Sequence, residues 1–546
     1  MFADKVLKSS KIFTSTGDEP FEGMVAIAGE RIAYAGPCTA AARAWVGPDT
    51  EVVELGDAFV CPGFHDSHVH FYQSALYRSR FVAFCEGTCA QDCVDALRAV
   101  EDARPRDAFM LGYGWYHPLW DDPVLPNKDI LDAVYPDRPV LLLSGDLHTL
   151  WCNSCALEKL GVTRDSVAPE GGVYQKDANG ELTGIIQEAA ADALLDQVNS
   201  GFTAQEEREA VRQLMRDLNA NGITSMGDVA PGTEEGPVAT YEALEAEGAL
   251  TVRMNIFPVL TDDLAFPRAL RARLSGHAYL RAPGVKQFFD GVSSTHTAWL
   301  SEDYSNAAFP GDCGAPIAQP EDMRRMVLAA AREGFPVRIH TIGDQAIHVA
   351  LDIFEEARRL YGPLPGGLKN GLEHLENFQP ADIERVRDAD VCANVQPPHM
   401  ALDPDGIERD LGVERAAYMW PFKTYERLGI TYSLGTDSPV VDINSRSVIY
   451  DAVTRRSAET GYPEDGWFTD ECITAAEAVR AYTRGSAIAC GRADEVGTLE
   501  AGTYADIAVL SHDIVGTEAH PIDPELIKSA EVLMTIVGGK VVYDER

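Results

Sequence analysis

The chain has 546 residues, enough for several domains, and its 46 Lys and Arg against 85 Asp and Glu give a net charge of −39. This charge excludes nucleic acid and anionic membrane surfaces as partners, because their phosphates would be repelled. Hydrophobic residues make up 45%, which predicts a large folded core. The sequence has no apolar run of about 18 residues, no basic start followed by an apolar run, and an odd total of eleven cysteines. We therefore expect a cytoplasmic protein without a disulfide framework.

Both ends of the chain read as short strands. Apolar segments separated by Gly29-Glu30 near the start, and by Gly538-Gly539 near the end, have the composition of β-hairpins. We interpret residues 1–60 and 491–546 as one small β-sandwich domain closed by both termini.

Between these ends, short apolar strands alternate with helix-like segments. The helices include 206–221, with apolar residues on one face, and a segment that the Thr474–Glu477 capping box opens and that runs to about Ile488. The expected strands are 59–70, 222–228, 251–260, 284–291, 336–344, 368–378, 391–397 and 430–439. Eight βα units predict an α/β fold with a (β/α)₈ TIM barrel over 61–490, interrupted after strand 1 by an aromatic-rich insertion at about 71–205. A doubly wound open sheet is the alternative, but no Gly-rich phosphate loop follows the first strand.

The strongest chemical pattern is His68-Val69-His70 at the end of the first barrel strand. Alternate residues of an extended chain share a face, so both imidazoles can point at one metal ion. A lone His-x-His also arises by chance, but other strand ends carry ligand-type side chains too, namely Lys286, Asp290, His340, His374 and Asp437. Because functional groups of such a barrel lie at the carboxyl ends of its strands, these residues should converge on one site.

These motifs resemble the amidohydrolase superfamily, specifically its YtcJ-like (amidohydrolase 3) branch, which includes N-substituted formamide deformylases. The resemblance covers nearly the whole chain and rests on PGFHDSHVH, the VKxFxDG-like strand, HTIGDQA, EH, GTDSP and the ending at 497–506. It implies that the metal ligands are His68, His70, a carboxylated Lys286 that bridges two ions, His340, His374 and Asp437. If Lys286 is instead an ordinary lysine with its head in solvent, the site holds one ion. Zinc is the favoured metal, as one or two ions.

The same resemblance implies a mechanism in which a metal-bound hydroxide attacks a carbonyl, with Asp437 as general base and then acid. His148 lies in a stretch similar to the family element D-x-H-x-x-W-x-N-S and is the candidate for polarising the substrate carbonyl. Trp115 and His399 are candidate substrate-binding residues, Trp115 by a family motif and His399 by its place after strand seven. The alternatives are packing roles for His148 and Trp115. Asp290 and Asp344 are interpreted as loop-shaping groups rather than ligands.

The cysteines carry no comparable pattern. Cys152 and Cys155 form a single C-x-x-C without the second pair that a zinc site needs. Cys85, Cys89 and Cys93 would share one face if their segment is helical, and we expect them to be buried thiols.

The leading functional hypothesis is therefore a metal-dependent amidohydrolase that cleaves a non-peptide C–N bond in a small molecule. The excess of acidic residues favours a neutral or cationic substrate. The resemblance to the family implies a homodimer. The alternatives are an esterase, lactonase or deaminase on the same metal site, or a barrel that has lost catalysis and only binds.

Overall fold

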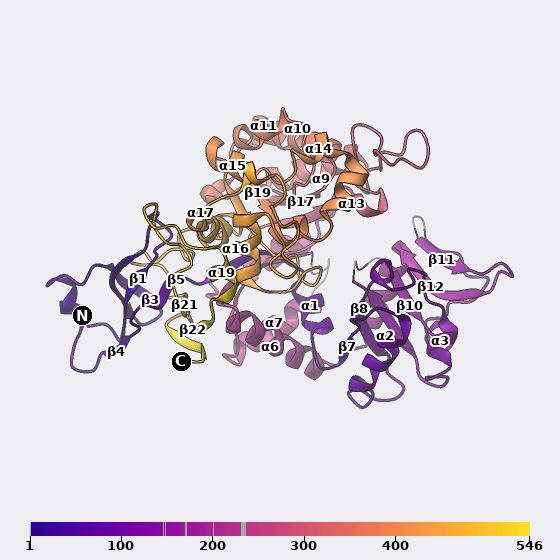
Figure 1. The fold of residues 1–546 in the computed structure, drawn as a ribbon, viewed down its shortest axis with the longest axis horizontal. Helices are drawn as coiled ribbons and strands as arrows, with labels where there is room; N and C mark the ends of the chain where they lie inside the picture. Colours follow the sequence, from indigo (N-terminus) through magenta and orange to yellow (C-terminus); the bar gives the residue numbers. More distant parts are fainter. Residues whose placement is uncertain (1, 146, 148, 170–171, 200, 231–235) are drawn as a thin grey trace. The chain divides into compact units, whose positions relative to one another are not determined.

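The computed structural model describes residues 2–145, 147, 149–169, 172–199, 201–230 and 236–546. It divides into two compact units, and we describe each by itself (Figure 1). The first unit comprises Met1–Phe71 and Met215–Arg546, and the second comprises Tyr72–Leu214. The second unit thus covers nearly the residues that the sequence assigns to an insertion.

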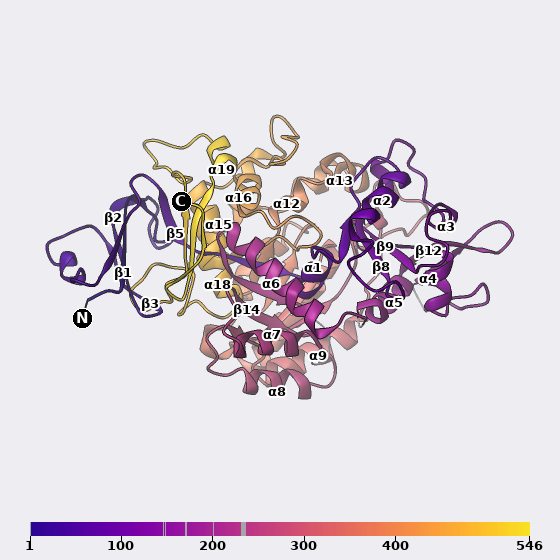
Figure 2. The same cartoon turned by 90° about the horizontal axis from the view of Figure 1, so that it is seen from below.

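One sheet of the first unit is built from both ends of the chain. Its strands are β1 (Lys5–Ile12), β2 (Phe21–Ala28), β3 (Arg31–Gly36), β4 (Glu51–Glu54), β5 (Phe59–Pro62), β21 (Ile507–Leu510), β22 (Val532–Val537) and β23 (Lys540–Asp544). The ends meet where β21 pairs antiparallel with β5, so the indigo and yellow strands lie side by side (Figure 2). Leu7, Val25, Val60, Ile507 and Ile536 form a buried cluster on this sheet, which anchors the chain just before the first predicted metal ligands.

The rest of the first unit contains two parallel sheets. One has the order β15-β14-β13-β6 and the other β16-β17-β18-β19-β20. The strands are β6 (Phe64–Val69), β13 (Ile223–Val229), β14 (Arg253–Phe257), β15 (Leu280–Arg281), β16 (Val285–Phe288), β17 (Val337–Thr341), β18 (Gly371–His374), β19 (Cys392–Val395) and β20 (Tyr432–Leu434). Parallel bridges link Val69 with Ser438 and Val259 with Lys286, so the two sheets also touch at both of their edges. Apart from the two-residue strand β15, each of these strands lies in a range expected from the sequence, with β13 running one residue beyond its range.

Helices follow most of these strands. They are α1 (Phe71–Tyr77), α6 (Ala204–Ala220), α7 (Gly236–Ala246), α8 (Ala265–Arg273), α9 (Pro320–Arg332), α10 (Asp344–Tyr361), α11 (Asp382–Asp388), α12 (Pro397–Met400), α13 (Pro404–Leu411), α14 (Val413–Ala416), α15 (Phe422–Leu428), α16 (Ser445–Thr454), α17 (Ala475–Arg480), α18 (Ser486–Ala489) and α19 (Glu525–Ser529). The capping box expected at Thr474 and Glu477 opens α17, and both of its hydrogen bonds are present. The helix continues through a π-helical turn, η7 (Ala481–Gly485), into α18, close to the expected end.

The second unit is built around a mixed sheet of order β11-β12-β10-β9-β8-β7. Its elements are β7 (Val82–Phe84), α2 (Ala90–Ala96), β8 (Met110–Trp115), α3 (Lys128–Asp132), β9 (Val140–Ser144), β10 (Thr149–Cys152), α4 (Ser154–Lys159), β11 (Gly172–Lys176), β12 (Leu182–Glu188) and α5 (Ala189–Asn199). Trp115, Trp120 and Trp151 belong to its buried core, which explains the aromatic content of the insertion as packing.

Short 3₁₀ turns complete the two units. They are η1 (Ala42–Trp45), η2 (Leu97–Val100), η3 (His117–Leu119), η4 (Ser293–Thr295), η5 (Pro365–Gly367) and η6 (Thr469–Glu471).

The three spaced cysteines do not share a helix face, and two of them are the buried thiols that the sequence predicts. Cys85 follows strand β7, Cys89 precedes α2 as its N-cap residue, and only Cys93 lies within the helix. Cys85 and Cys93 are buried, whereas Cys89 is exposed. The spacing i, i+4, i+8 crosses a strand end and a cap, and therefore does not describe one helix face. All eleven cysteines are free thiols. Among the described residues, no helix has both the length and the apolar character needed to cross a bilayer.

Candidate metal centre

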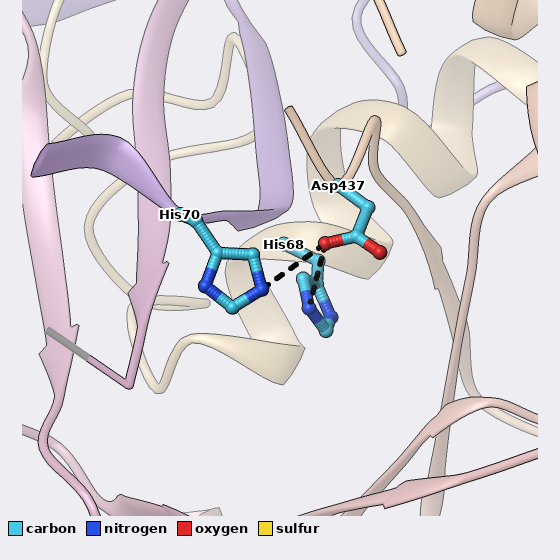
Figure 3. Close-up of side chains that lie close together, drawn as sticks. All are labelled: His68, His70 and Asp437. Atoms are coloured by element: carbon cyan, nitrogen blue, oxygen red, sulfur yellow. Dashed lines mark ion pairs between the residues drawn. The ribbon is translucent and has the colours of Figure 1, made fainter. Parts of the chain in front are cut away.

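The end of β6 presents two histidines to the carboxylate of Asp437. The Nε2 atoms of His68 and His70 both lie 3.3 Å from Asp437 Oδ1 (Figure 3). His68 is fully buried, and 20% of the His70 side chain is exposed. The alternation of the extended chain thus places both rings on one side, as the His-x-His spacing predicts.

Backbone hydrogen bonds hold Asp437 against this strand end. Its own N–H donates to the carbonyl of His68 at 2.8 Å, and the N–H of His70 donates to the carbonyl of Ser438 at 2.9 Å. Asp66 reinforces the junction, because its Oδ1 accepts from the N–H of Thr436 at 3.0 Å. Asp437 has a left-handed backbone with φ 62°, a conformation that non-glycine residues rarely adopt.

Two further predicted ligands approach from the neighbouring strands. The rings of His340 and His374 lie 4.4 Å apart between centroids, and the rings of His374 and His68 lie 4.9 Å apart. His374 Nδ1 lies 3.9 Å from Asp437 Oδ2 and 2.9 Å from Gln396 Oε1. The Nε2 atom of His340 lies 3.3 Å from the carbonyl oxygen of Gly291, so this nitrogen is the donor and Nδ1 is left as the acceptor.

Lys286, from β16, is completely buried, and its Nζ has no hydrogen-bond partner among the described residues. After burial, its charge is the next cause of the lowered pKa values of His68 and His340. Burial lowers the pKa of Lys286 itself to about 8. A fraction of this amine is therefore neutral near physiological pH.

His399 approaches Asp437 from the other side. Its Nε2 lies 3.7 Å from Asp437 Oδ2, its Nδ1 lies 3.8 Å from Glu376 Oε1, and 11% of its side chain is exposed. Its ring is nearly parallel to that of His374, with 9° between the planes and 5.8 Å between the centroids. Burial alone would lower the pKa of His399, but the carboxylates of Glu376 and Asp437 raise it above its ordinary value.

Electrostatics favour neutral imidazoles in the deep part of the site. Burial, followed by the charge of Lys286, lowers the pKa of His68 to about 4 and that of His340 to about 3. Burial and the neighbouring histidines likewise hold the pKa of His374 well below its ordinary range. Burial would raise the pKa of Asp437, but the surrounding histidines lower it, so its carboxylate is ionised at neutral pH. Neutral histidine and an ionised carboxylate are the forms that bind a divalent cation.

A network of buried charged side chains contacts His68 at Nδ1, the ring nitrogen that does not face Asp437. Glu373 Oε2 accepts from Nδ1 of His68 at 2.5 Å, and the guanidinium of Arg338 donates to both oxygens of Glu373 at 2.7 Å. Asn394 adds a further bond to Oε1 at 2.6 Å. A carboxylate on Nδ1 fixes the tautomer of a histidine and leaves Nε2 free for a metal.

The donor set fits a metal ion by an observation independent of any resemblance. His68 Nε2, His399 Nε2, Asp437 Oδ1 and Lys286 Nζ are all buried without a hydrogen-bond partner in the described chain. Buried polar atoms are almost always satisfied, so one carboxylate oxygen and three nitrogens gathered in one site favour a shared explanation. Two groups of three donors lie within 4.8 Å of one another: His68, His70 and Asp437, and then His374, His399 and Asp437.

The predicted set is therefore brought together around Asp437, with His340 and Lys286 beside it. Trp115 lies in the core of the second unit, where its Nε1 donates to the carbonyl of Leu142, and a role in substrate binding stays a prediction. His148 lies outside the described residues. Asp290 accepts from the backbone N–H groups of Trp299, Ile342 and Gly343, as a loop-shaping residue should.

The sequence reasoning missed Glu373, Arg338, Gln396 and Glu376. For the first two a signal existed, because each is an ionisable residue inside a short apolar strand. Such a residue must be paired when the strand is buried. Glu376 and Gln396 follow strand ends without any spacing that distinguishes them, and only the folded chain reveals their partners.

Comparisons with known proteins identify the family of the chain. The model of the family described as "Amidohydrolase family" matches residues 51–543. The chain belongs to this amidohydrolase family, and it is an enzyme of the metal-dependent amidohydrolase class.

Individual relatives extend along the whole chain. The putative amidohydrolase YtcJ of Bacillus subtilis is 29% identical over 91% of each chain. The N-substituted formamide deformylase of Arthrobacter pascens is 26% identical, covering 95% of this chain and 94% of its own. Among solved structures, an uncharacterized metal-dependent hydrolase from Pyrococcus furiosus superposes with a TM-score of 0.72 at 25% identity, over 95% of this chain and 99% of its own.

Proposed function

We propose that this protein hydrolyses a non-peptide C–N bond, of the amide type, in a small molecule at a metal centre organised by Asp437. The observation that carries the proposal is the position of the Asp437 carboxylate, which is shared between two groups of histidines and lies beside a buried lysine.

The residues that would hold the metal are His68, His70, His340, His374 and Asp437, with zinc favoured by the number of imidazoles. A divalent ion held there would supply a Lewis acid that polarises a carbonyl and lowers the pKa of water towards about 7. The neutral fraction of the Lys286 amine supports carboxylation of this residue, because only an unprotonated amine adds to carbon dioxide to give a carbamate and a proton.

The proposed task of Asp437 is to accept a proton from the attacking water and return it to the leaving nitrogen. Its carboxylate is ionised, buried and fixed by backbone bonds on both sides, so it can act without rearranging. Glu373 keeps the proton of His68 on Nδ1, and Arg338 keeps Glu373 ionised.

The proposed substrate class is based on similarity to relatives, and it is defined less closely than the reaction type. The similarity to a formamide deformylase over nearly the full chain favours a small amide, and a formamide is the first compound to test. The net charge of −39 favours a neutral or cationic amine portion.

The arrangement of the parallel strands is consistent with a barrel that carries this site. The parallel strands β6, β13, β14, β16, β17, β18, β19 and β20, bridged at both edges, support a closed (β/α)₈ barrel with the site at the carboxyl ends of its strands. The sheet built from both termini would form the accompanying β-sandwich.

The test uses the purified protein, freed of metal with a chelator and reloaded with zinc in the presence of bicarbonate. Hydrolysis of N-formyl and N-acetyl amines, and of esters with matched acyl groups, would be measured for wild type and Asp437→Asn. We expect amide turnover that requires metal and that falls by about 10²–10⁴-fold in the variant. Turnover of esters alone would replace the amide assignment, and full activity without metal would overturn the proposal.

A further inference from the structure

Two buried aspartates lie on either side of the segment that carries His68 and His70. Asp66 precedes the segment on β6, and Asp228 lies near the end of the neighbouring strand β13. The two residues are 0% and 1% exposed. Burying a carboxylate is costly unless hydrogen bonds replace the lost water. The hydrogen-bond partners of these two groups therefore indicate what each group does.

Asp66 joins the histidine segment to the turn that carries Asp437. Its Oδ1 accepts from the N–H of His68 at 3.3 Å and from the N–H of Thr436 at 3.0 Å. One carboxylate oxygen is thus shared between the backbone of a predicted metal ligand and the residue before another. The position of this oxygen sets the separation of the two segments.

Tyr482 holds the other oxygen of the same carboxylate. Its hydroxyl donates to Oδ2 of Asp66 at 3.1 Å. Its ring is fully buried and stacks on Phe64 of β6, with 5.6 Å between the centroids and 22° between the planes. Tyr482 belongs to the π-helical turn η7, and such turns occur frequently at functional sites. The stacked ring and the hydroxyl together fix the carboxylate in the orientation that lets Oδ1 reach the backbone.

Asp228 repeats this arrangement at the other end of the segment. Its Oδ1 accepts from the N–H of Phe71, the residue after His70, at 3.1 Å. Its Oδ2 accepts from the hydroxyl of Tyr241, on α7, at 2.9 Å. The buried ring of Tyr241 also meets the ring of Phe71 edge-on, with 5.5 Å between the centroids. In both pairs one oxygen binds a tyrosine, and the other binds a backbone N–H at or next to a predicted ligand.

We propose that these two Tyr–Asp pairs are positioning residues for the metal centre, each of which fixes the backbone at one end of the His68–His70 segment. This inference rests on the metal centre of the proposed function. The pairs act through backbone N–H groups and not by binding the metal or the substrate. Their effect is to keep both imidazoles at the separation from Asp437 that a shared ion requires.

The substitution of tyrosine by phenylalanine removes only the hydroxyl, so Tyr482→Phe and Tyr241→Phe are the test variants. Tyr450→Phe is the matched control. Tyr450 is also fully buried, and its hydroxyl donates to a carboxylate, that of Glu525, at 2.7 Å. Glu525 is 52% exposed and pairs with Lys528, so this bond links α16 to α19 and not to the histidine segment.

The zinc affinity of each metal-free protein would be measured by competition with a chelating dye, and its stability by urea unfolding without metal. We expect the urea midpoint to fall to a similar extent in all three variants, because each loses one buried hydrogen bond. Zinc affinity should fall by about tenfold in Tyr482→Phe and in Tyr241→Phe, as it does when an outer partner of a ligand is lost, and should not change in Tyr450→Phe.

Asp66→Asn separates position from charge. The amide oxygen can still accept from the N–H of Thr436, and the amide NH₂ can donate to the oxygen of Tyr482, so the geometry is kept while the charge is lost. The zinc affinity of this variant should therefore lie closer to that of the wild type than to that of Tyr482→Phe. A loss as large as that of Tyr482→Phe would show that Asp66 acts by its charge, and would overturn the positioning role.

Unchanged zinc affinity in both Tyr482→Phe and Tyr241→Phe, or an equal loss in Tyr450→Phe, would also overturn the positioning role while leaving the metal centre intact. A wild type that binds no zinc would instead overturn the proposed function, and this inference with it.

Discussion

The most informative perturbation is Glu373→Gln, which removes one buried charge and almost no volume. Glu373 and Arg338 are 0% and 1% exposed, and two bonds of 2.7 Å join them. The variant leaves the guanidinium of Arg338 buried without a counter-ion. Breaking a buried ion pair from one side costs about 3–5 kcal/mol, so we expect the free energy of unfolding to fall by about that amount.

The measurement is chemical or thermal unfolding of the metal-free protein, so that metal binding does not contribute to stability. Glu333→Gln is the matched control, because Glu333 forms the same two-bond pair with Arg268 at the surface, at 2.9 and 3.0 Å. Its effect should be several-fold smaller. The double variant Glu373→Gln with Arg338→Met should recover part of the loss, since it removes the uncompensated cation as well.

The pH dependence of the stability loss in Glu373→Gln is a second test of the ion pair. Burial would raise the pKa of Glu373, but Arg338 and Lys286 lower it well below 4.5. The ion pair therefore contributes stability that is present above pH 4.5 and is lost as the pH falls through the folded pKa. The difference in the free energy of unfolding between wild type and Glu373→Gln should become smaller at acidic pH. A loss of stability below about 1 kcal/mol at pH 7, or a stability difference that does not change with pH, would contradict a stabilising buried ion pair between Glu373 and Arg338.

Three further changes test other parts of the chain. Burial raises the pKa of Asp451 from 3.8 to about 8, so the free energy of unfolding of the wild type should fall as the pH rises from 3.8 to 8. Asp451→Asn should therefore raise the Tm at pH 8, and its difference from the wild-type Tm should close towards pH 4. A Tm difference that does not change with pH would contradict this. Asn153 makes four hydrogen bonds to backbone groups of the second unit, and Asn153→Ala should destabilise by about 3 kcal/mol or more in urea unfolding. A Cβ at Gly343 would lie 2.0 Å from the carbonyl oxygen of Trp299, so Gly343→Ala should lower the Tm clearly while Gly236→Ala, with open space, does not.

The elements were largely predictable because their signals are local. An apolar run that ends in a polar cluster marks a buried parallel strand, and each expected range coincides with an observed strand to within one residue at its edges or encloses it. The helix after Thr474 was predictable because a capping box satisfies the first backbone donors in any context. The cysteine spacing failed for the complementary reason: three cysteines spaced four residues apart do not distinguish a helix face from a strand, a turn and a cap in succession.

The candidate site was predictable only for residues at strand ends. His68, His70, His374 and Asp437 converge because parallel strands end at one edge, a property of the topology. Their orientation depends on contacts between distant segments, such as Glu373 with His68 and Glu376 with His399. No spacing in the sequence encodes those pairs, because the two partners of each pair belong to segments far apart in the chain.

Strained backbone conformations occur at the strand ends that carry His374 and Asp437. They explain why the alternation of side chains along an extended strand does not predict the direction of these two side chains. His374, Leu375 and Asp437 all have left-handed backbone conformations, with φ of 70°, 49° and 62°. For non-glycine residues such conformations cost about 1–3 kcal/mol each and persist only where the surroundings fix them. Those surroundings are visible: the N–H of Leu375 donates to the carbonyls of Thr341 and Glu373, and that of Asp437 donates to the carbonyl of His68. A strand that continued its extended course would send successive side chains to opposite faces. The left-handed turn at each strand end instead directs His374 and Asp437 towards one another, so the strain is the structural cost of bringing both sets of donors to one carboxylate.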